Sequence, residues 1–222
     1  MSVVESRREQ AKRERRQRIL AAAESLIEET AGTDFSMALL ADRAGISTYT
    51  TYNLIGHKST VLYVLLNQSL DQLDFFHDDS RSNLDPIECV FYSVDRIVEL
   101  FTSRSNLYRP LFGYLLSSSD PEHRPKFMKR SIDYWSRAYG PLDLAGYLMG
   151  PLKKIDLIRD AQMFFTGVVE YWVHGDLSNE DFSDHVVHGF ALRMLPLGIS
   201  SADSRIYLRL QQGRASITKL IG

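Results

Sequence analysis

The chain has 222 residues, of which 44% are hydrophobic and 24% charged, a composition typical of a soluble globular protein with one large or two small domains. The mean hydropathy of −0.20 and the lack of any apolar run near the roughly 18–20 residues that cross a bilayer exclude a membrane-spanning chain. We therefore expect a cytoplasmic protein without a membrane partner. Cys89 is the only cysteine, which excludes an internal disulfide and a thiolate metal cluster, and we expect it to be buried and reduced.

The first 18 residues are strongly basic although the formal charge of the whole chain is −2. They contain seven Arg or Lys against three Glu, a formal charge of +4, and the remaining 204 residues carry −6. Two interpretations stay open for such a run. Residues 1–15 form a solvated, disordered arm, or this arm contacts DNA phosphates or the minor groove, with Arg16 at its end.

A first helix is predicted just after this basic run. It lies at the start of residues 16–60, which form the predicted N-terminal domain. Its apolar residues recur with the helical period and end near a glycine, Gly32, which is a natural stop. The residues on this apolar face are Ile19, Leu20, Ala23, Leu26 and Ile27.

Two short helices joined by a glycine turn come next. Ser36 is a predicted N-cap for a helix over Met37–Ala44, because its hydroxyl accepts a hydrogen bond from a free amide of the first turn. Gly45 adopts a positive φ without a Cβ penalty and so allows a tight turn. Ser47 then caps a helix over Thr48–Ile55. This arrangement is typical of a helix-turn-helix that places its second helix in the major groove of DNA.

The second short helix is polar and β-branched, which gives it poor intrinsic stability. Its hydroxyls and its amide suit phosphate oxygens and base edges rather than a protein core. The polar residues in question are Thr48, Tyr49, Thr50, Thr51, Tyr52 and Asn53.

This segment resembles the DNA-binding domain of the TetR family of bacterial transcriptional repressors. The matching residues are Ser36, Ala41, Ala44-Gly45-Ile46-Ser47, Tyr52 and Lys58. The resemblance implies that Tyr52 and Lys58 hold DNA phosphates, that Ser36 caps its helix and touches the backbone, and that Thr48, Tyr49 and Thr50 face the groove. Tyr49 and Ile55 depart from the family pattern. The predicted DNA-binding residues are Arg16, Ser36, Ser47, Thr48, Tyr49, Thr50, Tyr52 and Lys58.

The rest of the chain is predicted to be helical, with no alternating strand pattern, so the predicted fold is all-α: an N-terminal three-helix helix-turn-helix domain plus a larger helical effector-binding and dimerisation domain over residues 61–200. Residues 201–222 add a C-terminal helix. The polar stretch Asp78–Pro86 is a predicted loop. The predicted helices are Val61–Leu73, Ile87–Phe101, Leu107–Ser118, Pro125–Tyr139, Ile155–Val173, Glu180–Leu195 and Asp203–Ile221.

The helices Ile155–Val173 and Glu180–Leu195 carry more apolar surface than a one-sided stripe requires. This breadth indicates either a deeply buried core pair or a homodimer interface. The family resemblance implies the dimer, which binds a palindromic operator in double-stranded DNA with half-sites about 34–36 Å apart. The predicted interface residues are Phe164, Val168, Tyr171, Val186, Phe190 and Met194.

The middle of the chain is rich in aromatic residues with polar tips. Such residues at helical spacing are ordinary core, or they line a pocket for a small, largely apolar effector that is aromatic or lipid-like. The candidate pocket residues are Tyr108, Phe112, Tyr134, Trp135, Phe165 and Trp172.

The predicted function is a ligand-responsive, DNA-binding transcriptional regulator, a repressor that a small, largely apolar effector releases from its operator. Two other classes of function stay open beside it. No catalytic motif or phosphate-binding glycine loop occurs, so we expect no enzyme and no cofactor. His185 and His188 lie three residues apart and suit zinc, which leaves a metal-responsive regulator as an alternative, although no third ligand is close in sequence and no metal site is predicted. The other alternative is a helical protein-interaction module that does not bind DNA.

Overall fold

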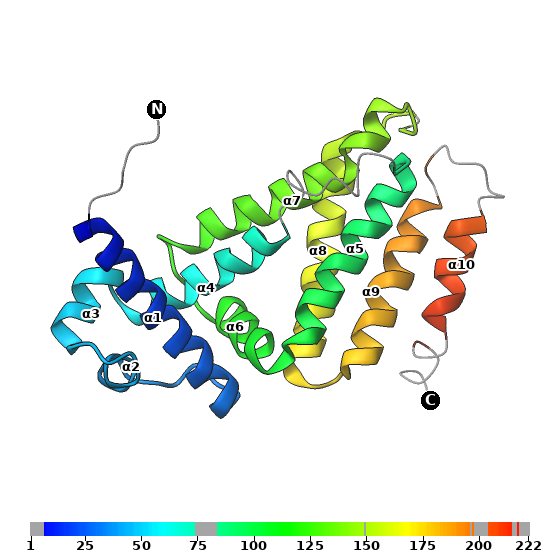
Figure 1. Cartoon of the computed structure of the whole chain (residues 1–222). Helices are drawn as coiled ribbons and strands as arrows, with labels where there is room; N and C mark the ends of the chain where they lie inside the picture. Colours follow the sequence, from blue (N-terminus) through cyan, green and yellow to red (C-terminus); the bar gives the residue numbers. More distant parts are fainter. Residues whose placement is uncertain are drawn as a thin grey trace. The chain divides into compact units, whose positions relative to one another are not determined.

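The computed structural model describes residues 7–73, 84–148, 150–195, 197, 204–214 and 217. Helices are the only regular elements in these residues, which confirms the predicted all-α fold (Figure 1). None of the helices in this part of the chain is long and apolar enough to cross a bilayer. The helices are α1 (Arg7–Thr30), α2 (Met37–Arg43), α3 (Thr48–Ile55), α4 (Lys58–Gln72), α5 (Pro86–Ser103), α6 (Ser105–Ser117), α7 (Arg124–Leu144), α8 (Lys154–His174), α9 (Asn179–Met194) and α10 (Ser204–Gln212).

The helices belong to two compact units. The N-terminal unit extends to Gln68 and also includes Asn106–Pro125, and the C-terminal unit contains Ser69–Ser105 and the chain from Lys126 onward. The division predicted at residue 60 therefore differs from the observed one, which falls inside α4 and adds α6 to the N-terminal unit. Helix α4 has apolar residues along most of its length. Its sequence therefore does not show where the helix stops packing in one unit and begins packing in the other.

The prediction of a disordered arm over residues 1–15 is corrected for Arg7 to Arg15, because α1 begins at Arg7. The buried residues of α1 begin only at Ile19, as the helical period predicted. The preceding twelve residues consist of Arg, Lys, Glu, Gln and Ala, all good helix formers, so the helix continues outward without a core beneath it. Residues 1–6 of the predicted arm lie outside the described part of the chain.

Two prolines lie inside helices of the described chain. Pro110 is inside α6, and Pro141 is inside α7, which continues to Leu144 rather than ending near Tyr139. Proline removes one helical hydrogen bond but does not prevent the following residues from remaining helical when their tertiary packing is favourable. Leu142, one residue after Pro141, is fully buried and provides that packing.

The start of α5 is fixed by a capping box. Asp85 accepts hydrogen bonds from the amides of Ile87 and Glu88, at 2.8 and 3.1 Å, and Glu88 accepts one from the amide of Asp85. Pro86, which the sequence placed in a loop, is instead the first residue of this helix, where proline needs no amide partner. Residues 78–83 of the predicted loop lie outside the described chain.

The core of the C-terminal unit is a cluster of aromatic rings. Trp172 lies 4.8 Å from Phe182 between ring centroids, and Trp135 lies 4.8 Å from Phe190. Phe165, on α8, touches both Trp135 and Phe182. Helix α9 packs on α5, α8 and α10, so its side chains are covered from several directions (Figure 1). Cys89 is buried and free, as expected.

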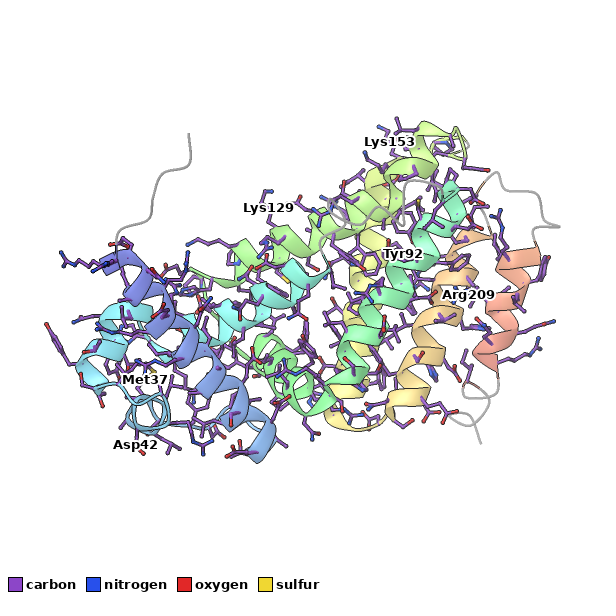
Figure 2. The ribbon with its side chains drawn as sticks, in the orientation of Figure 1. Met37, Asp42, Tyr92, Lys129, Lys153 and Arg209 are labelled. Carbon is purple, nitrogen blue, oxygen red and sulfur yellow. The ribbon has the colours of Figure 1, made fainter. Side chains whose placement is uncertain are left out.

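Helix α10 is attached to α5 and α9 through polar contacts. Arg209 donates two hydrogen bonds to Asp95 on α5, at 2.7 and 2.6 Å, and Arg205 is paired with Asp85. His188 on α9 shares a 2.7 Å hydrogen bond with the Leu210 carbonyl. Figure 2 labels Arg209 on α10. These contacts hold α10 against α5 and α9. The predicted start of this helix at Asp203 and its residues 215, 216 and 218–221 lie outside the described chain.

Gly189 is a site where a single methyl group is expected to disturb the core. A Cβ at this position would lie 2.0 Å from Cζ of Phe164, and this ring is also held by Phe190 and by the Arg193 guanidinium, 3.7 Å from its centroid. We expect Gly189→Ala to lower the free energy of unfolding by about 1–3 kcal/mol, measured by urea denaturation.

The matched control is Gly140→Ala on α7, where a Cβ meets nothing within 4 Å. Alanine is the better helix former, so this variant is expected to gain up to about 1 kcal/mol. A Gly189→Ala variant that is as stable as Gly140→Ala would contradict the close packing of Phe164.

Candidate functional site

The first three helices of the N-terminal unit form a small core. Leu40 and Ala41 of α2 are buried, as are Thr51 and Ile55 of α3, and both helices pack against α1. Figure 2 labels Met37 and Asp42, which mark α2. The short α3 is therefore stabilised by its neighbours, as its poor intrinsic helix propensity requires.

The predicted caps and turn of this segment are confirmed. Ser36 accepts a hydrogen bond from the Leu39 amide at 3.1 Å, and Ser47 accepts one from the Thr50 amide at 3.2 Å. Gly45 has a φ of +64°, the left-handed conformation that favours glycine. The glycine lets the chain reverse between α2 and α3 and so sets the angle at which α3 is presented.

One face of α3 is open to solvent and polar. Thr48, Tyr49, Tyr52 and Asn53 are exposed, and the exposed fraction of Tyr49 reaches 78%. A large aromatic side chain gains nothing for folding from this exposure, so the face is available for a partner. Thr50 is half-buried, and its hydroxyl lies 2.8 Å from the Ser47 hydroxyl, which ties it to the cap.

Lys58 lies at the start of α4, immediately after the helix-turn-helix. Its Nζ lies 4.0 Å from a carboxylate oxygen of Asp34 and 5.4 Å from the centroid of the Phe35 ring. The Tyr52 ring meets His57 edge to face, with centroids 5.6 Å apart. These contacts hold Tyr52 and Lys58 at the C-terminal end of α3. Arg16 lies on α1 and is exposed.

Asn53 and His57 are not among the predicted DNA-binding residues, although both are exposed and lie on or beside the open face of α3. Asn53 follows Tyr49 by four residues, so the helical period places both on one face. That spacing was a usable signal for Asn53. The position of His57 depends on the turn after α3 and could not be derived from a helical period.

An ion pair that the sequence did not indicate joins α1 to α2. Arg43 donates two hydrogen bonds to the Glu29 carboxylate, at 2.7 and 2.9 Å, and a third to the Ser25 hydroxyl. The hydrogen bonds from Arg43 and from Ser25 lower the pKa of Glu29 from 4.5 to about 2. The pair fixes the end of α2 against α1.

The Glu29 pair is expected to make the stability of this unit depend on pH. Because the pKa of Glu29 is lowered on folding to about 2, its contribution is complete above 4.5 and is lost as the pH falls from 4.5 through about 2. We expect Glu29→Gln to be less stable than the wild type at neutral pH, and the difference in urea midpoint to shrink as the pH approaches 2. A difference that stays constant over this pH range would contradict the assignment.

The predicted dimer residues fall into two groups. Three of them, Phe164, Val168 and Tyr171 on α8, line a groove of about 330 Å³ together with Met163, Gly167, Leu177 and His185. Met163 and Tyr171 are 73% and 58% exposed.

The other three predicted interface residues are corrected. Val186, Phe190 and Met194 are fully buried inside the C-terminal unit, because α5, α8 and α10 all cover α9. Hydrophobic breadth alone does not distinguish a helix covered by its own chain from one covered by a partner. The exposed apolar residues at the end of α9 are instead Leu192 and Leu195.

The predicted effector-pocket residues are buried but are divided between the units. Tyr108 and Phe112 belong to the N-terminal unit, and the other four belong to the C-terminal unit. Trp135 and Phe165 touch each other, with ring centroids 5.5 Å apart, and Tyr134 donates a hydrogen bond to the Ser93 carbonyl. The indole nitrogen of Trp172 donates to Asn179 at 3.0 Å. These four residues therefore have structural partners, and an effector role for them stays a prediction.

His185 and His188 do not form a metal site with a third ligand. Nδ1 of His185 lies 2.7 Å from the Asp181 carbonyl, and Nδ1 of His188 bonds the Leu210 carbonyl. Within the described ranges no group of three or more His, Cys, Asp or Glu is arranged to hold a metal ion. The structure thus gives no support to the metal-responsive alternative.

Known proteins match the chain through their folds. No family model and no curated protein sequence matches the chain. Among solved structures, a TetR-family transcriptional regulator from Syntrophomonas wolfei matches with a TM-score of 0.69 and 18% identity, over 82% of this chain and 96% of that one. FadR from Thermus thermophilus, a TetR-family repressor in complex with lauroyl-CoA, matches with a TM-score of 0.63 and 20% identity, over 81% and 92%. A TetR regulator from Rhodococcus sp. RHA1 matches with a TM-score of 0.59 and 18% identity, over 78% and 93%. The chain therefore has the fold of the TetR family of transcriptional regulators.

Proposed function

We propose that the chain is a ligand-responsive, DNA-binding transcriptional regulator, and specifically a repressor that a small, largely apolar effector releases from its operator. The observation that carries the proposal is the open polar face of α3, formed by Thr48, Tyr49, Tyr52 and Asn53 on a helix anchored by buried Thr51. A helix fixed by its neighbours and polar on its free side suits the major groove, where hydroxyl and amide groups read base edges.

The residues around α3 suit contacts with the DNA backbone. Ser36 and Ser47 hold the first turns of α2 and α3, whose free amides are suited to phosphate oxygens. Arg16 precedes α3 in the sequence and Lys58 follows it, and both residues supply positive charge. In this assignment Thr48, Tyr49 and Thr50 face the groove, and Tyr52 and Lys58 hold phosphates.

The groove on α8 supports a homodimer. Two large apolar side chains, Met163 and Tyr171, stand exposed beside Gly167, where a Cβ would meet nothing within 4 Å. The absence of a side chain at Gly167 lets a second helix approach closely. A second copy of the chain is the occupant we propose, because a symmetric dimer presents two α3 helices to a palindromic operator.

The double variant Met163→Glu/Tyr171→Glu is expected to convert the dimer to a monomer, because it places two charges in an apolar groove. Analytical ultracentrifugation measures the change, and circular dichroism should remain unchanged because both side chains are exposed. The control is Leu144→Glu on α7, which is 91% exposed and distant in sequence. A double variant that still sediments like the wild type would show that dimerisation does not use this face.

The effector is proposed to be a lipid-like molecule that acts by shifting a two-state equilibrium. The aromatic, apolar middle helices suit such a ligand, and the FadR neighbour was solved with lauroyl-CoA. An effector weakens DNA binding only if it binds the DNA-free state more tightly than the DNA-bound state.

The test starts with operator selection from a random double-stranded DNA library, followed by titration with lauroyl-CoA and with lauric acid. We expect the chain to select a palindromic sequence and at least one of the two lipids to lower its affinity for that sequence. If the selection enriches no sequence, the proposal that the chain is a DNA-binding regulator is refuted. A lipid that binds tightly and leaves operator affinity unchanged would refute release by that lipid.

A further inference from the structure

The first twelve residues of α1 form a rigid basic extension. The segment Arg7–Arg18 carries seven Arg or Lys and two Glu, and it precedes Ile19, the first buried residue of the helix. Twelve helical residues span about 18 Å. Because this extension continues a helix that is anchored in the N-terminal unit, its charges keep a defined direction, unlike those of a flexible arm.

Four of the seven basic residues share one face, which we name the basic face and define as Arg8, Lys12, Arg15 and Arg16. At about 100° per residue they fall within an arc of about 100°. This arc coincides with the sector of the buried residues further along α1, among them Ala23 and Leu26. The basic face therefore points to the same side of α1 as the residues that pack against α2 and α3.

The four side chains of the basic face are available for a partner. All four are exposed, and none makes an ion pair or side-chain hydrogen bond among the described residues. In Figure 1 the first turns of α1, in dark blue, lie near α3, and the Glu29–Arg43 pair places the end of α2 at the opposite end of α1. The basic face thus extends past the core beside the helix proposed to read DNA.

We propose that the basic face binds the phosphate backbone of the same DNA duplex that α3 enters, and so adds a rigid, sequence-independent contact to each half-site. The proposal rests on the proposed function. Duplex DNA is the partner whose negative charge matches the positive charge of the basic face, since its phosphates follow one another every few ångströms along the axis. Neutralising phosphates releases counterions, so each contact steepens the salt dependence of binding.

The test compares two double variants that remove the same charge from different faces of α1. Arg8→Gln/Lys12→Gln removes two charges from the basic face. Arg7→Gln/Arg18→Gln removes two charges that lie about 120° away around the helix. Glutamine is a good helix former, so both variants should keep α1, which circular dichroism checks.

Binding to the selected operator and to an unrelated duplex is measured by fluorescence anisotropy over a salt series. We expect Arg8→Gln/Lys12→Gln to weaken both DNAs by about tenfold or more and to make the slope of log affinity against log salt less steep by about 2 per chain bound. The Arg7→Gln/Arg18→Gln variant should stay close to the wild type. Equal effects of the two variants would show a general charge effect, and no effect of either would show no contact; both results overturn the proposal. A wild-type chain that binds neither DNA refutes the proposed function itself.

Discussion

The double variant Tyr49→Ala/Asn53→Ala is expected to lower affinity for the selected operator by about 30-fold or more, because each good base contact discriminates by about 1–3 kcal/mol. Both side chains stand on the open face of α3 and are exposed. The free energy of unfolding should therefore stay within about 0.5 kcal/mol of the wild type. Anisotropy titrations and urea denaturation measure the two quantities on the same preparations.

The contrast with Lys58→Ala identifies the kind of contact that is lost. Lys58 is assigned to a phosphate, so its removal should weaken the operator and an unrelated duplex by the same factor. Tyr49→Ala/Asn53→Ala should weaken the operator much more than the unrelated duplex. If it weakens both equally, α3 does not read bases and its open face has another role.

Trp172→Ala is expected to destabilise the C-terminal unit by about 3–5 kcal/mol. The indole is fully buried and contacts the Phe101 and Phe182 rings, and its nitrogen donates to Asn179 at the start of α9. Truncation leaves a cavity and removes the hydrogen bond from the indole to Asn179. Thermal and urea denaturation measure the loss.

The control for Trp172→Ala is Ile155→Ala in the first turn of the same helix, which is 46% exposed and should change stability by less than about 0.5 kcal/mol. The comparison also decides between the two interpretations of the aromatic residues. A Trp172→Ala variant that folds with wild-type stability but loses its response to lipid would place Trp172 in an effector pocket instead of the core.

The parts of the site that the sequence predicted are those set by short-range chemistry. Ser36 and Ser47 each bond an amide three residues away, and Gly45 adopts the positive φ that its turn requires. These interactions lie within one turn of the chain, so the residue types alone indicate them. The buried face of α1 could also be predicted, because that face follows the helical period.

The parts that the sequence could not supply depend on contacts between distant segments. The Glu29–Arg43 pair joins residues fourteen apart, and Val186 and Phe190 are buried because three helices surround α9. The helical start at Arg7 was missed for a different reason. A charged run without apolar residues has no period from which to infer a helix, although its intrinsic helix propensity is high.

The central claim is that the N-terminal unit binds DNA, and the salt dependence of duplex binding by the full-length chain tests it most directly. Anisotropy titrations against the selected operator between about 50 and 200 mM salt should show log affinity falling linearly with log salt, with a slope of about −4 or steeper. The operator should also bind more tightly than an unrelated duplex at every salt concentration. A slope near zero, or equal affinity for both duplexes throughout, would contradict a sequence-reading DNA-binding protein.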